Sequence, residues 1–171
     1  RQRQMCIRDR YKYLLELLRG GLYEQFSETM RQAAIPFLDP AVYGRSTLEN
    51  SSFLVSSVNP EEALHGRGYV ARLSGSTAEF MSIWQIMMFG RKPFLRTESG
   101  VQINLQPCIP AYLIDEERTI RAAFMENSTV IYHFAECRDY FPGSYSIRIR
   151  SMVDVDAIRQ GAATETVADI F

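Results

Sequence analysis

The segment that most limits what this chain can fold into is LSGSTAEFMSIWQIMMFG, residues 73–90. Ser76 and Glu79 have the spacing of a capping box, in which both side chains accept hydrogen bonds from free amides at the start of a helix. Gly90 is a typical end of a helix. Almost every residue between these signals is apolar, so the segment predicts a helix that is buried nearly all round. Such a helix needs a larger body around it.

The first part of the chain has a helical hydrophobic period. Apolar residues recur at helical spacing over residues 13–26, and Gly20-Gly21 predicts either a break between two helices or a tolerated weak point in one helix. Pro36 is expected to end the second helix near Ala34. A long connection rich in glycine and proline follows, and loops of this length are usually functional.

After Pro93 the hydrophobic period is close to two, which is typical of β-strands. The runs at 119–126 and 129–136 are separated by so short a turn that they predict a β-hairpin. Four or five strands are expected to form an antiparallel sheet, as half of a sandwich, and the tail is expected to add one more strand. The sequence therefore predicts an α+β fold.

The first ten residues, RQRQMCIRDR, contain four arginines and fit neither pattern. A basic arm or a targeting signal is one interpretation, but the apolar run Met5-Cys6-Ile7 is interrupted at once by charged residues. The segment resembles the translation of a transposase adapter used in sequencing libraries. Residues 1–10 are therefore expected to be an adapter artefact, and the chain to be the C-terminal fragment of a longer protein.

Composition argues against several classes of partner. Removing the four Arg and one Asp of residues 1–10 lowers the formal net charge from −1 to −4, which argues against nucleic acid. No run approaches the roughly 18 apolar residues of a membrane span, so no membrane partner is expected. Cys108 and Cys137 are interpreted as free thiols, which favours a cytoplasmic location, while pairing in a secreted protein stays open.

Few residues form a pattern with chemistry of its own. Gly75 and Ser76 stand where a helix begins, and free amides at such a place bind anions, although small residues also cap many helices for structural reasons alone. His65 and His133 have no other ligand at metal-binding spacing, so no metal site is predicted. The sequence contains no nucleophile elbow, Walker loop or dinucleotide fingerprint.

Two longer motifs resemble a known family. The stretches LDPAVYGRSTLENSSFLVSS (38–57) and LHGRGYVARLSGSTAEFMSIW (64–84) resemble the C-terminal end of glycoside hydrolase family 94, the cellobiose phosphorylase relatives. The similarity covers about residues 12–160. It implies C-terminal helices of an (α/α)6 barrel over residues 11–92, followed by a small C-terminal antiparallel β-domain over residues 93–171.

The resemblance implies a sugar-binding segment. Tyr43, Glu49 and Asn50 match residues that lie at the sugar-acceptor subsite in the family. Arg45 lies in the same segment and is included among the expected sugar-binding residues. Leu48 stands where cellobiose-active members have a basic residue, so an unusual substrate is one alternative.

The resemblance also implies a phosphate site. A family Thr-Gly pair that helps hold inorganic phosphate at a helix start matches Ser74-Gly75, and Ser76 follows directly. Ser56 stands where the family has a phosphate-binding histidine. Inorganic phosphate is the expected co-substrate of a phosphorolysis, with water as the alternative acceptor, and no other cofactor is expected.

The implied function is that of an inverting glycoside phosphorylase, or a related glycosidase, acting on β-linked glucosides of an oligosaccharide substrate. The parent protein is expected to be a homodimer. The family's catalytic acid lies upstream of this segment, so no catalytic residue is predicted and the fragment alone is expected to be inactive. Asp39 and Glu49 are the nearest carboxylates.

The alternative function is a non-catalytic β-domain module that binds glycans or stabilises an assembly. An open concave site around Tyr43, Glu49, Ser74 and Gly75 would favour the enzyme. Scattered residues, or residues that are buried and satisfy each other's hydrogen bonds, would favour the module.

Helices taken from a barrel would lack some of their neighbours. An apolar patch larger than a soluble monomer normally exposes is then expected on those helices. It should include Leu14, Leu17, Leu18 and Trp84.

Overall fold

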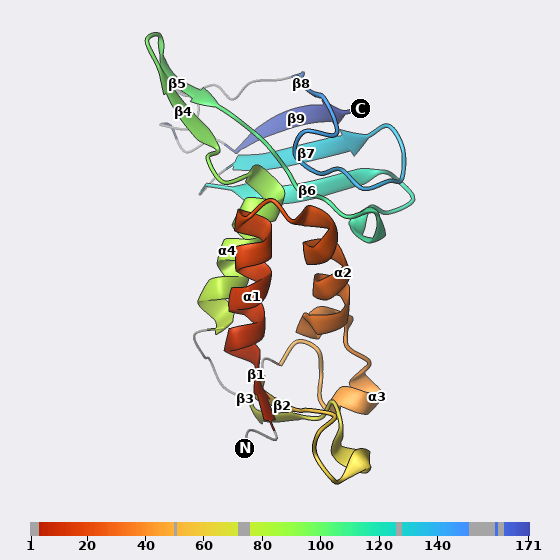
Figure 1. Ribbon diagram of the computed structural model, residues 1–171. Coiled ribbons are helices and arrows are strands. Elements are labelled where there is room, and N and C mark those ends of the chain that lie inside the picture. Colours follow the sequence, from red (N-terminus) through yellow and green to blue (C-terminus); the bar gives the residue numbers. More distant parts are fainter. Residues whose placement is uncertain (1–3, 50, 72–75, 126–127, 151–159, 161–162) are drawn as a thin grey trace. The chain divides into compact units, whose positions relative to one another are not determined.

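The structure is a computed structural model, and the chain divides into two compact units, residues 1–86 and 87–171 (Figure 1). At residues 4–8, 71, 76 and 164 the structure describes the backbone alone. The described residues are 4–49, 51–71, 76–125, 128–150, 160 and 163–171.

The first unit is built on two helices that lie side by side, α1 (Ile7–Arg19) and α2 (Tyr23–Ala33) (Figure 1). The expected break at Gly20-Gly21 is confirmed, since Gly21 has a φ of 76° and turns the chain between the helices. The expected end of the second helix before Pro36 is also confirmed, because α2 stops at Ala33.

The region just before α1 also takes part in the fold. The strand β1 (Gln4–Cys6) pairs with a later strand, and α1 begins at Ile7. Arg10 Nη1 donates a hydrogen bond of 3.2 Å to the carbonyl oxygen of Ala33, at the end of α2. Residues 4–10, which the adapter resemblance assigns to an artefact, therefore form β1 and the first residues of α1.

The long connection after α2 contains strands and short helical turns. The strand β2 (Ser51–Val55) lies between β1 and β3 (Gly68–Ala71), and both pairings are antiparallel. β2 and β3 coincide with the apolar clusters Phe53-Leu54-Val55 and Tyr69-Val70, which are residue types common in strands. The helical turns of the connection are η1 (Ile35–Phe37), α3 (Pro40–Tyr43) and η2 (Glu62–Leu64).

The prediction that residues 11–92 are helices of an (α/α)6 barrel is wrong. The described part of the first unit combines α1, α2 and the first turns of α4 (Ser76–Phe89) with a three-stranded sheet. Leu14, Leu17 and Leu18, expected to be exposed, are only 1%, 7% and 0% exposed. The reason is that the turn at residues 20–21 folds α2 back along α1, so these leucines lie in a core formed within the chain.

The prediction that the helix at residues 76–90 is buried nearly all round is also wrong. Met81 and Trp84, on one side of α4, are 66% and 43% exposed, whereas Ile83 and Met87 are buried. Apolar composition alone does not report which side of a helix is covered. Within the described residues, no helix has both the length and the apolar character needed to cross a membrane.

The second unit contains a hairpin and a four-stranded sheet. The predicted β-hairpin of residues 119–136 is confirmed by the antiparallel pairing of β6 with β7, and the extra strand expected from the tail is β9. The bounds are β4 (Phe94–Thr97), β5 (Gly100–Ile103), η3 (Ala111–Leu113), β6 (Thr119–Phe124), β7 (Ser128–Phe134), β8 (Ile147–Ile149) and β9 (Thr164–Ile170).

The expectation of a purely antiparallel sheet is wrong. The strand order is β6-β7-β9-β8, and β9 runs parallel to β7. The last strand enters the sheet between β7 and β8, because its apolar residues Ala168 and Ile170 are fully buried there. The position of β9 in the sheet depends on where its apolar side chains are buried. Turn residues, on which the prediction was based, indicate pairing only between strands that follow each other in the sequence.

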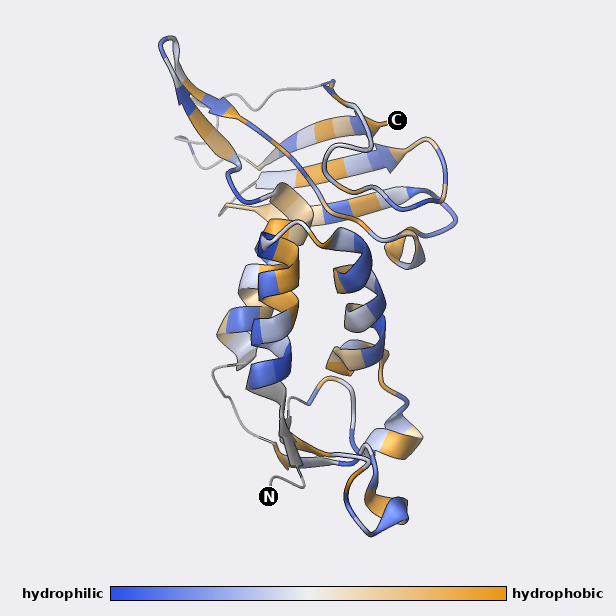
Figure 2. Cartoon of the chain, in the orientation of Figure 1, coloured by the Kyte–Doolittle hydropathy of each residue, from blue (hydrophilic) through white to orange (hydrophobic). Residues whose placement is uncertain are grey.

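The core of the second unit also includes the last turn of α4. The Tyr132 hydroxyl on β7 donates a hydrogen bond of 2.6 Å to the carbonyl oxygen of Met88. The rings of Phe89 and Phe124 lie 4.7 Å apart between centroids. Burial raises the pKa of Tyr132, which therefore stays protonated as a hydrogen-bond donor. Figure 2 shows hydrophobic stretches within each of β6, β7 and β9.

An ion pair at the sheet gives this unit a predictable response to acid. Asp169, which is 9% exposed, accepts two hydrogen bonds from the Arg150 guanidinium. These bonds lower the pKa of Asp169 below its ordinary value. The stabilisation is therefore fully present above the ordinary aspartate pKa of about 3.9 and is lost as the pH falls through the lowered value.

Replacing Asp169 by asparagine is expected to remove part of this acid dependence. The measurement is the free energy of unfolding from urea titrations between neutral pH and pH 2, for the wild type and for Asp169→Asn. Glu165→Gln is the matched control, because the Arg121–Glu165 pair is 3.5 Å apart and more than half exposed on both sides. An Asp169→Asn variant with the wild-type acid slope would contradict the prediction.

Candidate functional site

The expected sugar-binding segment begins at the short helix α3. Asp39 starts it, since its Oδ1 accepts a hydrogen bond of 2.9 Å from the Ala41 amide, and Pro40 stands at the first helical position. Gly44, with a φ of 71°, ends the helix in the left-handed conformation that favours glycine. This geometry turns the side chain of Tyr43 toward the sheet of the first unit, where it is 1% exposed.

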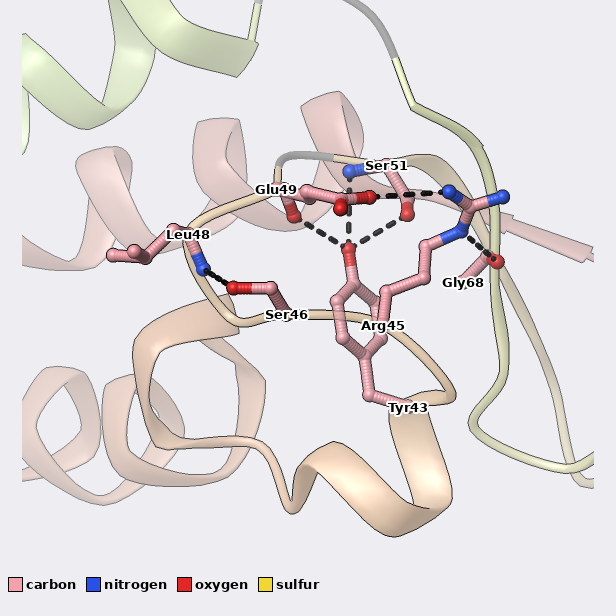
Figure 3. Close-up of polar contacts among 7 residues, drawn as sticks. All are labelled: Tyr43, Arg45, Ser46, Leu48, Glu49, Ser51 and Gly68. Atoms are coloured by element: carbon pink, nitrogen blue, oxygen red, sulfur yellow. Dashed lines mark hydrogen bonds and ion pairs between the residues drawn. The ribbon is translucent and has the colours of Figure 1, made fainter.

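The Tyr43 hydroxyl is fully used by neighbouring protein groups (Figure 3). It donates to the carbonyl oxygen of Glu49 at 2.8 Å and accepts from the amide of Ser51 at 3.1 Å. The Ser51 hydroxyl, which is also buried, lies 2.6 Å away. The tyrosine therefore ties the loop of residues 44–49 to the beginning of β2.

Arg45 and Glu49 form the more exposed part of the same cluster. Arg45 Nε donates to the carbonyl oxygen of Gly68 at 3.0 Å, and its Nη1 lies 3.1 Å from Glu49 Oε2. Their side chains are 36% and 50% exposed. Leu48, at the tip of the loop, is 95% exposed, and its amide donates to Ser46 Oγ (Figure 3).

The structure thus brings together three of the four expected sugar-binding residues. Tyr43, Arg45 and Glu49 are in contact through the network above, whereas Asn50 lies outside the described residues. Tyr43 is buried and satisfied by protein groups, so its hydroxyl is not available to a ligand. Arg45 and Glu49 keep part of their surface open.

The expected phosphate site is described only in part. Ser74 and Gly75 lie outside the described residues. Ser76 is the first residue of α4, and only its backbone is described. The helix start is therefore where the motif predicts it.

A cavity of about 280 Å³ lies beside the loop tip and the first turn of α4, and we name it the loop–helix pocket. Tyr11 and Phe80 supply aromatic rings whose centroids are 5.5 Å apart. Burial raises the pKa of Tyr11, whose oxygen accepts a hydrogen bond of 3.2 Å from the Ile35 amide. The lining includes Tyr11, Ile35, Thr47, Leu48, Thr77 and Phe80.

Sequence reasoning missed the aromatic side of this pocket. Thr47 and Leu48 belong to one recognised motif and Thr77 and Phe80 to the other, but Tyr11 precedes both. The available signal was the helical position of an aromatic residue near the start of α1. That signal alone does not distinguish a core residue from a pocket residue.

The two histidines have structural partners. His65 Nε2 lies 2.8 Å from the carbonyl oxygen of Asn59, and His133 Nδ1 lies 3.2 Å from Thr119 Oγ1. In the part of the chain that the structure describes, no three His, Cys, Asp or Glu residues are grouped so that they could hold a metal ion.

Removing the Tyr43 hydroxyl is expected to destabilise the first unit. Tyr43→Phe leaves the buried Ser51 amide and hydroxyl without this partner, which is expected to lower the free energy of unfolding by about 1–3 kcal/mol. Urea titration measures the change. Tyr69→Phe is the control, since Tyr69 on β3 is 36% exposed and should change stability by less than about 0.5 kcal/mol. Equal effects of the two substitutions would contradict the structural role of Tyr43.

Comparison with protein-family models found no model that matches the chain. A search of curated proteins found no match either. The resemblance to glycoside hydrolase family 94 stays a prediction that rests on the motifs at residues 38–57 and 64–84.

Proposed function

We propose that this chain binds carbohydrate in the loop–helix pocket, as part of a glycoside phosphorylase or a related glycosidase that acts on β-linked glucosides. One observation carries the proposal. The two motifs that resemble the family are separated in sequence, yet Thr47 and Leu48 of the first and Thr77 and Phe80 of the second line the same cavity.

The chemistry of the pocket suits a sugar ring. The Phe80 ring, whose centroid lies 5.5 Å from that of the buried Tyr11 ring, offers apolar surface to the C–H face of a pyranose. The hydroxyls of Thr47 and Thr77 can donate and accept hydrogen bonds with sugar hydroxyls. Apolar walls with a few polar groups are typical of small-molecule sites, and about 280 Å³ is close to the lower end of their usual volume.

The proposed role is binding without proton transfer. Asp39 is used to begin α3, and Glu49 is paired with Arg45. Neither carboxylate lines the loop–helix pocket. The general acid that glycosidic cleavage requires is therefore not assigned to these residues.

Inorganic phosphate as co-substrate is part of the same proposal. The start of α4 directs free amides and the positive end of the helix dipole outward. Thr77, one residue after the helix start, lines the pocket, and Ser74, Gly75 and Ser76 enter the proposal as phosphate-binding residues through the family resemblance alone.

A second candidate function is a non-catalytic module that binds glycans or stabilises an assembly. The observation that favours it is the burial of Tyr43, whose hydroxyl is satisfied by Glu49 and Ser51. In that case the tyrosine motif serves the stability of the loop, and the pocket binds sugar without a reaction.

Sugar binding is tested by NMR titration of the 15N-labelled chain with glucose and cellobiose. Amide shifts at Thr47, Thr77 and Phe80 are expected, and Phe80→Ala should weaken binding about tenfold, which corresponds to about 1.4 kcal/mol. Met81→Ala is the matched control, because Met81 is the next residue on α4, is 66% exposed and does not line the pocket. Absence of shifts in the pocket at 50-fold excess sugar would overturn the proposal.

The reaction is tested separately, with the parent protein and cellobiose. Release of glucose 1-phosphate that depends on added phosphate supports phosphorolysis, and phosphate-independent release of glucose supports hydrolysis. Binding of sugar without either product supports the module.

The proposed compartment is the reducing cytoplasm. Cys108 is buried and Cys137 is exposed, and both are free thiols. Burial raises the pKa of Cys108 to about 12, so this thiol stays protonated and unreactive. A homodimeric parent protein remains part of the proposal through the family resemblance alone.

A further inference from the structure

The loop–helix pocket offers a ligand more apolar surface than hydrogen-bonding groups. Its lining also includes Pro36, and none of these described residues has a charged side chain. The Tyr11 hydroxyl is buried and accepts from the Ile35 amide, which leaves the hydroxyls of Thr47 and Thr77 as the polar side-chain groups of the half-buried lining. A charged ligand would therefore lose its hydration there without gaining an ion pair.

The small number of polar side chains limits how much of a sugar the pocket can hold. A glucose ring carries hydroxyls around its edge, and each hydroxyl that leaves water without gaining a partner weakens binding. The hydroxyls of Thr47 and Thr77 can satisfy part of one ring. A second sugar ring would add hydroxyls for which the lining has no further polar side chain. The pocket therefore suits one sugar joined to an apolar group.

Leu48 presents apolar surface that such a group would cover. Its side chain is 95% exposed although it lines the pocket. The turn that carries it is held by two hydrogen bonds to Ser46, from the Leu48 amide to Oγ at 3.2 Å and from the Glu49 amide to the carbonyl oxygen at 3.0 Å. The leucine is thus placed in water by a fixed turn, and covering it with an apolar group is favourable.

The volume and the aromatic lining favour an aromatic ring as this group. An apolar cavity of roughly 150 Å³ binds a benzene-sized molecule. The loop–helix pocket, at about 280 Å³, is larger and leaves room for part of a sugar ring. The half-buried Phe80 ring already lies 5.5 Å from the Tyr11 ring between centroids, and a ligand ring can pack on it in the tilted or offset arrangements that aromatic pairs prefer.

We propose that the loop–helix pocket selects β-glucosides whose aglycone is a single aromatic ring, and that Leu48 is the residue that determines this preference. The inference rests on the proposed function and names the substrate class of the same site. The sugar would bind through Thr47 and Thr77, and the aglycone would lie against Leu48, Pro36 and Phe80.

The test is an NMR titration of the 15N-labelled full chain with phenyl β-D-glucoside and, separately, with methyl β-D-glucoside. The shifts are read at the amides of Thr47, Thr77 and Phe80. The two ligands have the same sugar and the same linkage and differ only in the aglycone. The Kd of the phenyl glucoside is expected to be about tenfold lower, because its ring covers apolar surface that the methyl group does not reach.

The role of Leu48 is tested by its own variant. Leu48→Ala is expected to reduce the tenfold preference to about twofold, and because the side chain is exposed this variant should fold normally. Val58→Ala is the matched control and should keep the preference, since Val58 is 71% exposed in the same unit and does not line the pocket. A tenfold preference that persists in Leu48→Ala would overturn the role of Leu48.

The remaining outcomes separate this inference from the proposed function. Equal Kd values of the two glucosides at the pocket amides would overturn the inference and leave the proposed function standing. Absence of shifts with both glucosides would overturn the proposed function, and the inference with it. Phenol is titrated as a third ligand and is expected to bind more weakly than phenyl glucoside. Phenol binding that equals that of the glucoside would show that the sugar contributes nothing, which would overturn both.

Discussion

Replacing Leu18 by alanine is expected to lower the free energy of unfolding of the first unit by about 2–5 kcal/mol. Leu18 of α1 is 0% exposed, so truncation removes buried methyl groups and leaves a cavity. Trp84 is the only tryptophan in the sequence and lies in the first unit, so its fluorescence reports this unit during urea titration.

Met81→Ala is the control for Leu18→Ala. Met81 is similar in size but 66% exposed, and its truncation is expected to change stability by less than about 0.5 kcal/mol. The comparison distinguishes the observed core from the predicted barrel fragment, in which Leu18 would face solvent. A loss below about 1 kcal/mol for Leu18→Ala would show that this leucine is not in a packed core.

Replacing Gly68 by alanine is expected to lower the free energy of unfolding by about 3 kcal/mol, at the upper end of the usual effect of overpacking. An added Cβ would lie 2.2 Å from Tyr43 Cε2 and 2.5 Å from Ser51 Oγ. Neither side chain can move away cheaply, because both are buried and joined through the Tyr43 hydroxyl. The same tryptophan signal measures the change.

Gly44→Ala is the control for Gly68→Ala. Gly44 lies in the same segment and has a φ of 71°, but an added Cβ would meet only the Arg67 side chain at 3.8 Å or more. Its replacement should therefore cost only the backbone strain of a left-handed residue, about 1–2 kcal/mol. If Gly68→Ala lowers the free energy of unfolding no more than Gly44→Ala does, Tyr43 is not closely packed against β3.

The elements that the sequence predicted correctly are those set by local signals. Local signals predicted the break at Gly20-Gly21, the end of α2 before Pro36 and the β-hairpin of residues 119–136. Each depends on interactions between residues close in sequence, such as a left-handed turn or a short connection. The prediction of barrel helices was wrong because it concerned which helices pack against one another, and local signals in the sequence do not report such contacts.

The candidate site shows the same division. Tyr43, Arg45 and Glu49, which the motif places in one expected sugar-binding segment, are joined by hydrogen bonds, and their binding of sugar stays a prediction. Whether a tyrosine hydroxyl faces a ligand or a protein group depends on Ser51 at the beginning of β2, and hence on how the loop packs on the sheet. The loop–helix pocket likewise needs Tyr11 and Phe80 to meet, and they are far apart in the chain.

The sequence by itself determined the helical character of the first part, the strands of the second part and the breaks between consecutive elements, because turns and caps are local. Only the tertiary structure decided that β9 lies parallel to β7 and that Leu18 is buried while Met81 is exposed. These outcomes depend on which distant surfaces exclude water together, and burial of that kind is a property of the packed chain and of no single segment.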